Sequence, residues 1–136
     1  MPTVTPDPAS AHQPTSTGLA PNVAGLLSYV LGPITGIVFL VLEKENRFVR
    51  FHAAQSVAVG VALIIASILL TVLSTILAFI PILGWIIAAI AGLGFSLLTF
   101  VLWLLLMYKA FQGEEWEVPV VGKYARQYVA RETPVV

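Results

Sequence analysis

Few side chains of this 136-residue chain could do chemistry, and they are unevenly placed. The densely charged internal segment Glu43–Gln55 lies between two long apolar blocks and holds His52, one of two histidines. From Phe51 to Tyr108 there is no Asp, Glu, Lys or Arg, which excludes intramembrane aspartate pairs and zinc-binding His-Glu-x-x-His helices. We expect the other histidine, His12, to lie across the membrane from His52, where the two cannot share a metal. Without cysteine there is no thiol chemistry, so we predict no enzyme and no cofactor.

The charged segment is predicted to form a helix with two different faces, beginning after Asn46 as its N-cap. Glu43, Arg47 and Arg50 share a face suited to water and lipid phosphates, and aromatic and polar side chains fill the adjoining face. Ordinary flanking charge explains the arginines equally well, and a lone boundary histidine is most often structural. The predicted site for a membrane partner or lipid consists of Arg47, Phe48, Arg50, Phe51, His52 and Gln55.

The composition is that of an integral membrane protein. Hydrophobic residues make up 58% of the chain, and the mean hydropathy is +0.92. Runs of about twenty or more apolar residues suit a hydrocarbon core of roughly 30 Å. We therefore predict an all-α bundle of three transmembrane helices, at about 22–42, 53–79 and 82–108, with a cytoplasmic juxtamembrane helix between the first two. The transmembrane domain is 21–109, with tails 1–20 and 110–136.

The first predicted span contains Pro33, which removes a backbone donor and predicts a kink near Gly32. The alternative is a re-entrant pair of half-helices, 22–31 and 33–42, which does not cross the membrane. Between the later spans, Pro81 and Gly84 predict a turn, followed by Trp85 at headgroup depth.

Charge bias predicts the orientation. All seven Lys and Arg residues lie in the loop after the first span or beyond 108, so three spans place them on one face. The N-terminus is then outside and the C-terminus cytoplasmic.

Small residues recur at every fourth position in each span, a spacing that lets helices approach closely in lipid. Chance is the alternative explanation for any one of these ladders. They are Ala24, Ser28, Gly32 and Gly36; Ala54, Ala58, Ala62 and Ala66; and Gly84, Ala88, Gly92 and Ser96.

The two tails differ in character. Residues 1–20 are rich in Pro, Ser and Thr and are predicted to be disordered. In the C-terminal tail, the acidic residues Glu114, Glu115 and Glu117 could pair with the basic hinge. Beyond Pro119, either a short interfacial helix or a loosely held tail is expected.

The runs Gly18–Tyr29, Gly36–Ser56 and Lys109–Glu114 resemble a family of small uncharacterised prokaryotic membrane proteins. More distantly, an Arg-Phe-x-x-x-Gln element at Arg50–Gln55 is similar to one in the small membrane subunit of the chloroplast inner-envelope protein translocon (Tic-type). The close resemblance implies a membrane location without an activity, and the distant one implies a channel or translocation role.

We therefore predict a multi-pass protein of the cell membrane, embedded in the lipid bilayer, that binds a membrane-protein partner or forms a homo-oligomer. Its near-zero net charge gives no reason to expect nucleic acid as a partner. The alternative function is that of a channel or translocation component.

Overall fold

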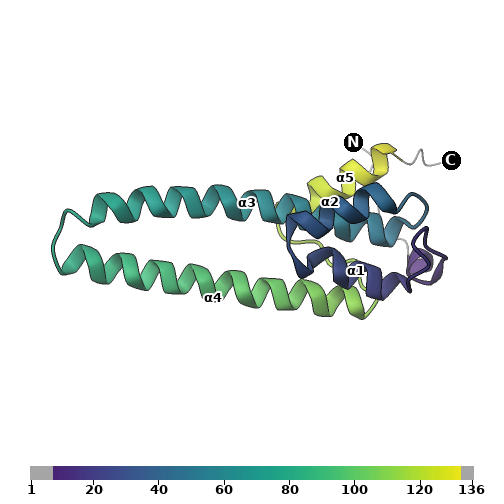
Figure 1. Cartoon of the computed structure of the whole chain (residues 1–136), viewed down its shortest axis with the longest axis horizontal. Helices are drawn as coiled ribbons and strands as arrows, with labels where there is room; N and C mark the ends of the chain where they lie inside the picture. The colour runs from purple at the N-terminus through teal and green to yellow at the C-terminus, as the bar shows by residue number, and fades with distance from the viewer. Residues whose placement is uncertain (1–7, 133–136) are drawn as a thin grey trace.

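The computed structural model describes residues 8–132 and is all-helical over that range. The elements are a short 3-10 helix η1 (Pro8–His12) and the α-helices α1 (Pro21–Val30), α2 (Pro33–Leu42), α3 (Arg47–Leu77), α4 (Leu83–Phe111) and α5 (Gly122–Glu132). Figure 1 shows α3 and α4 as one long hairpin, with the shorter helices gathered at one end of it.

The α3–α4 hairpin forms because two long apolar runs are separated by residues that cannot continue a helix. Pro81 follows α3, and Ile82 takes a positive φ of 65° in the turn. At Gly84 a Cβ would lie 1.8 Å from the Leu77 carbonyl oxygen, so the turn closes only with glycine there. Both helices are long and apolar enough to cross a membrane, as predicted for the second and third spans.

The first predicted span is divided into two ten-residue helices, an arrangement that matches the two half-helices of the re-entrant alternative. The chain breaks at Gly32, whose φ is +62°, because Pro33 has no N–H to donate. The Thr35 hydroxyl fills part of the gap, accepting from the Leu31 amide at 3.2 Å and donating to the Ser28 carbonyl at 3.0 Å. Each ten-residue half is about 15 Å long, half of a hydrocarbon core.

The α1–α2 hairpin lies against α3 and α4 with its tip pointing toward their middle (Figure 1). Close approach depends on small residues of the first predicted ladder. A Cβ at Gly36 would lie 2.8 Å from the Ala53 carbonyl oxygen, and Ala24 and Ser28 are fully buried. At the tip, Pro33 fills the space that a side chain at Gly60 would need. The small residues of α1 and α2 therefore serve packing within the chain.

Residues 8–20, predicted to be disordered, are bound to the start of α3 instead, and residues 1–7 lie outside the described range. The Asn46 amide donates to the carbonyls of Ser10 at 2.7 Å and Gln13 at 2.9 Å, and Ser16 binds the Glu43 carboxylate. Polar groups of this otherwise irregular segment thus find partners in the α2–α3 connection. The expectation missed these contacts because they join residues more than 25 positions apart.

The same contacts bring the two ends of the described chain together. Residues 8–20, the connection 43–46 and α5 lie together at one end of the α3–α4 hairpin, which we call the polar end. The described N-terminal and C-terminal segments therefore lie at the same end of the α3–α4 hairpin, and the orientation with the N-terminus outside and the C-terminus cytoplasmic stays a prediction. All seven basic residues also lie at this end, as the charge bias predicted, and which side of the membrane it faces stays a prediction.

The rest of the molecule, residues 61–100, is two helices thick, and we call it the apolar hairpin. Its side chains find few partners within the chain, and exposed large hydrophobics follow both helices for their whole length there. On α3 and α4 they include Ile64, Ile65, Ile68, Leu69, Val72, Ile76, Ile86, Ile90, Leu93, Leu97 and Leu98. The buried core lies at the polar end, where α1, α2 and α5 cover the start of α3.

Candidate functional site

The predicted site residues occupy the first three turns of α3, and the structure buries five of the six. Asn46 caps this helix as predicted, since its side chain accepts from the Val49 amide at 3.1 Å. Side chains of the site are then enclosed by α1, α2, α5 and the segment after α4. Phe48, Arg50, Phe51, His52 and Gln55 are buried, and Arg47 is half-buried.

A hydrogen-bonded chain of three buried side chains joins α1 to α3. The Tyr29 hydroxyl lies 2.8 Å from His52 Nδ1 and 3.0 Å from Gln55 Nε2. His52 Nε2 lies 3.0 Å from the Glu114 carbonyl oxygen, which can only accept, so this nitrogen carries the proton. His52 Nδ1 then accepts from Tyr29, and Tyr29 accepts from Gln55. The neutral imidazole satisfies every group in the chain.

Gln55 extends this chain to the segment after α4. Its Nε2 donates to the Trp116 carbonyl at 2.9 Å, and its Oε1 accepts from the Val118 amide at 2.9 Å. Close to it, a Cβ at Gly122 would lie 2.5 Å from Gln55 Oε1. The Gln55 amide thus hydrogen-bonds to a backbone carbonyl and to a backbone amide of the same segment. These bonds replace the backbone hydrogen bonds that an extended segment would otherwise make with a neighbouring strand.

Arg50 binds the C-terminal end of α2. Its guanidinium donates to the Leu40 carbonyl at 3.0 Å and to the Glu43 carbonyl. Last-turn carbonyls carry partial negative charge that a guanidinium stabilises. Arg50 therefore fixes the α1–α2 hairpin onto α3, and the expected headgroup contact at this residue stays a prediction.

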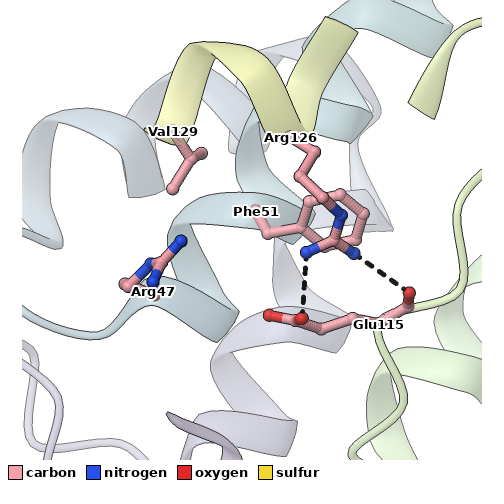
Figure 2. A pocket seen from close by; sticks show the side chains of 5 residues that line it. All are labelled: Arg47, Phe51, Glu115, Arg126 and Val129. Atoms are coloured by element: carbon pink, nitrogen blue, oxygen red, sulfur yellow. Dashed lines mark hydrogen bonds and ion pairs between the residues drawn. The ribbon is translucent and has the colours of Figure 1, made fainter. Parts of the chain in front are cut away.

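Arg126 of α5 takes the place predicted for the hinge arginines as partner of the acidic cluster. Figure 2 shows its guanidinium over the Phe51 ring, 4.1 Å from the centroid, with interactions to Glu115. It also pairs with Glu117, whereas Glu114 pairs with Lys109 at 2.8 Å. The cavity beside Arg47, Glu115 and Arg126 is about 10 Å³, room for no more than a water molecule.

Glu43 organises the connection between α2 and α3. Its carboxylate accepts from the backbone amides of Ser16, Glu45 and Asn46 at 2.9–3.0 Å and from the Ser16 hydroxyl at 2.9 Å. Burial alone would raise the pKa of Glu43, but these hydrogen bonds favour the anion and hold the pKa below its ordinary value. Glu43 is thus a structural anion.

The arrangement as a whole is a closed polar cluster with its hydrogen bonds made inside the chain. Its groups hold helices and the flanking segments together. Among residues 8–132, no three or more His, Asp or Glu side chains stand close enough to bind a metal ion.

Sequence reasoning missed three members of this cluster, Tyr29, Glu43 and Arg126. Tyr29 was counted as part of an apolar span and Arg126 as part of an exposed tail. A tyrosine four residues before the Pro33 break was the one available signal, since its hydroxyl needs a partner at depth.

Comparison with known proteins places the chain among small membrane proteins. The family described as "Magnetosome magnetite crystal formation protein family" matches residues 14–125. A UPF0132 membrane protein of Methanocaldococcus jannaschii is 46% identical over 114 residues, 84% of this chain and 93% of the relative. One from Archaeoglobus fulgidus is 46% identical over 108 residues, covering 79% and 94%, respectively. A second from M. jannaschii is 37% identical over 111 residues, covering 82% and 71%.

These matches agree with the predicted close resemblance to an uncharacterised membrane family. The printed names of these relatives give no activity and no translocon role. No solved structure matches the chain significantly.

Proposed function

We propose that this chain, which belongs to the Magnetosome magnetite crystal formation protein family, is a non-enzymatic membrane module. It binds a membrane-protein partner or a second copy of itself through the outward face of α4. The printed names of its relatives state a membrane location and no activity, so the proposal depends on the structure.

A partner cannot bind the predicted face at the start of α3 in this structure, because five of its six residues are buried against the chain's own helices. The surface that remains unpartnered is the apolar hairpin, which consists of two helices, whereas five helices meet at the polar end. Its exposed side chains face lipid or another membrane helix.

Two glycines in the middle of α4 carry the proposal. A Cβ at Gly92 or Gly94 would meet nothing within 4 Å, whereas Gly36, Gly60 and Gly84 each stand against a neighbour that leaves no room. Glycine inside a helix costs about 1 kcal/mol relative to alanine, so packing within the chain does not explain these two. Small residues on a lipid-facing helix allow another helix to approach closely, which supports contact with a partner here.

The third predicted ladder supports the same face. Gly84 belongs to the turn, but the half-buried Gly92 and the exposed Ser96 lie one turn apart on α4, and a Cβ at Gly92 would meet nothing within 4 Å. The family description names magnetite crystal formation. The proposed function concerns contact between helices in the bilayer and takes no mineral chemistry from that name.

The test is photo-crosslinking in native membranes from a probe at Leu93, between the two glycines. We expect capture of a distinct membrane protein or of the same chain, and Gly92→Val with Gly94→Val should reduce capture about fivefold or more. The Cβ of either valine would meet no atom within 4 Å, so with unchanged helix content by circular dichroism the reduction would report on contact with a partner. Leu98→Ile, at an equally lipid-facing position, is the matched control and should leave capture unchanged.

Capture of lipid alone, or capture that the glycine substitutions do not reduce, would contradict the proposal. Mass spectrometry of the adduct distinguishes a partner from a second copy. The channel or translocation role stays a prediction of the distant resemblance, which conductance in reconstituted vesicles would test.

A further inference from the structure

Charge at the polar end is unbalanced once the internal pairs are counted, although the formal net charge is zero. Hydrogen bonds and ion pairs engage the carboxylates of Glu43, Glu114, Glu115 and Glu117 within the chain. Four cations have no carboxylate partner among the described side chains, whereas two described carboxylates, the buried Glu43 and the exposed Glu45, have no cation. The four are Lys44, Arg47, Lys123 and Arg131. The surface at this end is therefore basic.

Two of these cations stand on α5 beside an apolar groove of about 320 Å³. Leu40 of α2 and Val57 and Ala58 of α3 line its floor, and Tyr124 and Tyr128 of α5 form its wall. The tyrosines are one turn apart and are 59% and 46% exposed, so the wall is open outward. Lys123 Nζ lies 5.3 Å from the centroid of the Tyr124 ring, which places the cation at the groove's edge.

The groove has the depth that one lipid molecule occupies. Val57 is ten residues beyond Arg47, or about 15 Å along α3, which is inside the hydrocarbon if Arg47 lies among headgroups. Tyrosine prefers the boundary between headgroups and hydrocarbon. A cavity of about 150 Å³ holds a benzene molecule, so this groove has room for a longer stretch of one acyl chain.

We infer that the groove between α2, α3 and α5 binds one anionic phospholipid, with an acyl chain on Leu40, Val57 and Ala58 and the headgroup phosphate at Lys123. The positive charge of Lys123 favours an anionic headgroup, and Arg131 adds to the positive electrostatic potential at this surface. The contact of Arg126 with the Phe51 ring holds α5 against α3. Arg126 therefore positions the groove wall, and Lys123, on the outer side of α5, contacts the lipid. This inference does not rest on the α4 face.

Native mass spectrometry of the detergent-solubilised full chain tests it, with phosphatidylglycerol and phosphatidylcholine carrying the same acyl chains as probes. We expect one phosphatidylglycerol to bind several-fold more tightly than phosphatidylcholine. Lys123→Gln should reduce the phosphatidylglycerol affinity about fivefold and leave phosphatidylcholine unchanged. Lys44→Gln removes the same charge at the same end from a residue that does not line the groove, and should change neither affinity by more than about twofold.

Ala58→Phe fills the groove without changing charge and should abolish single-lipid binding of both probes, with unchanged helix content by circular dichroism as the check on folding. Equal affinity for the two lipids would overturn the inference, as would an equal loss in Lys44→Gln and Lys123→Gln. Binding that survives Ala58→Phe would overturn it too. If Ala58→Phe dissociates a dimer and lipid binding is absent, a second copy covers the groove instead.

Discussion

At the scale of single residues, the start of α3 is a hub where side chains replace secondary structure. His52 and Gln55 bind backbone of the segment after α4, and Arg50 binds backbone at the end of α2. Each of these side chains binds backbone N–H or C=O groups that have no hydrogen-bond partner within their own segment, because that segment is irregular or is the end of a helix. This explains why a polar cluster can be buried beside an apolar bundle without a catalytic role.

The contribution of the buried hydrogen bonds to stability can be tested at the Tyr29 hydroxyl. Tyr29→Phe removes the donor to His52 and the acceptor for Gln55, leaving buried polar groups unpaired. We expect a loss of about 1–3 kcal/mol in the free energy of unfolding, measured by denaturant titration in detergent. Tyr108→Phe is the matched control, because that hydroxyl is exposed and its loss should cost less than about 0.5 kcal/mol. Equal stability of the two variants would show that the chain of hydrogen bonds is not needed.

At the scale of elements, connections decide the arrangement more than helix lengths do. The α2–α3 connection is four residues long and receives its geometry from Glu43, while Asn46 both caps α3 and binds residues 8–20. The α1–α2 break has its geometry from Gly32 and Pro33. Two polar residues and a Gly-Pro pair thus set the two turns, and these turns fold the short apolar helices α1 and α2 into a hairpin.

Glu43 should make this connection sensitive to acid. Its folded pKa lies below the ordinary value of 4.5, so the stabilisation is present above that pH and is lost as the pH falls through the lower, folded pKa. We expect the apparent Tm of the wild type to fall as the pH is lowered from about 5 to 3, and to fall less for Glu43→Gln. Thermal unfolding at half-unit steps of pH measures this. Parallel curves for the two proteins would exclude Glu43 as the titrating group.

At the scale of the whole molecule, the fold has two parts with different surroundings. The polar end makes its own core from five helices, and the apolar hairpin leaves most of its surface to the membrane. With α3 and α4 as two crossings and α1–α2 as a re-entrant hairpin, we expect residues 8–20 and α5 to lie on the same side of the membrane.

Cysteine labelling tests this topology directly, because the chain has no cysteine of its own. With a membrane-impermeant maleimide on sealed vesicles of one orientation, we expect Thr17→Cys and Lys123→Cys to react from the same side. Phe79→Cys, in the exposed turn between α3 and α4, should react only from the other side. Labelling of Thr17→Cys and Lys123→Cys from opposite sides would restore the three-span arrangement.

The sequence by itself determined the helical class, the membrane location, the α3–α4 hairpin with its turn and the Asn46 cap. These depend on local properties, such as hydropathy, the place of Pro81 and Gly84, and an Asn before a helix, so a short window of residues specifies each. Only the tertiary structure decided between a kinked span and a re-entrant hairpin at Pro33, because both satisfy the local backbone equally. It also decided that Phe51, His52 and Gln55 face inward. Their partners, Arg126, Tyr29 and the backbone at 114–118, are more than twenty residues away, and helical periodicity gives a face without saying what covers it.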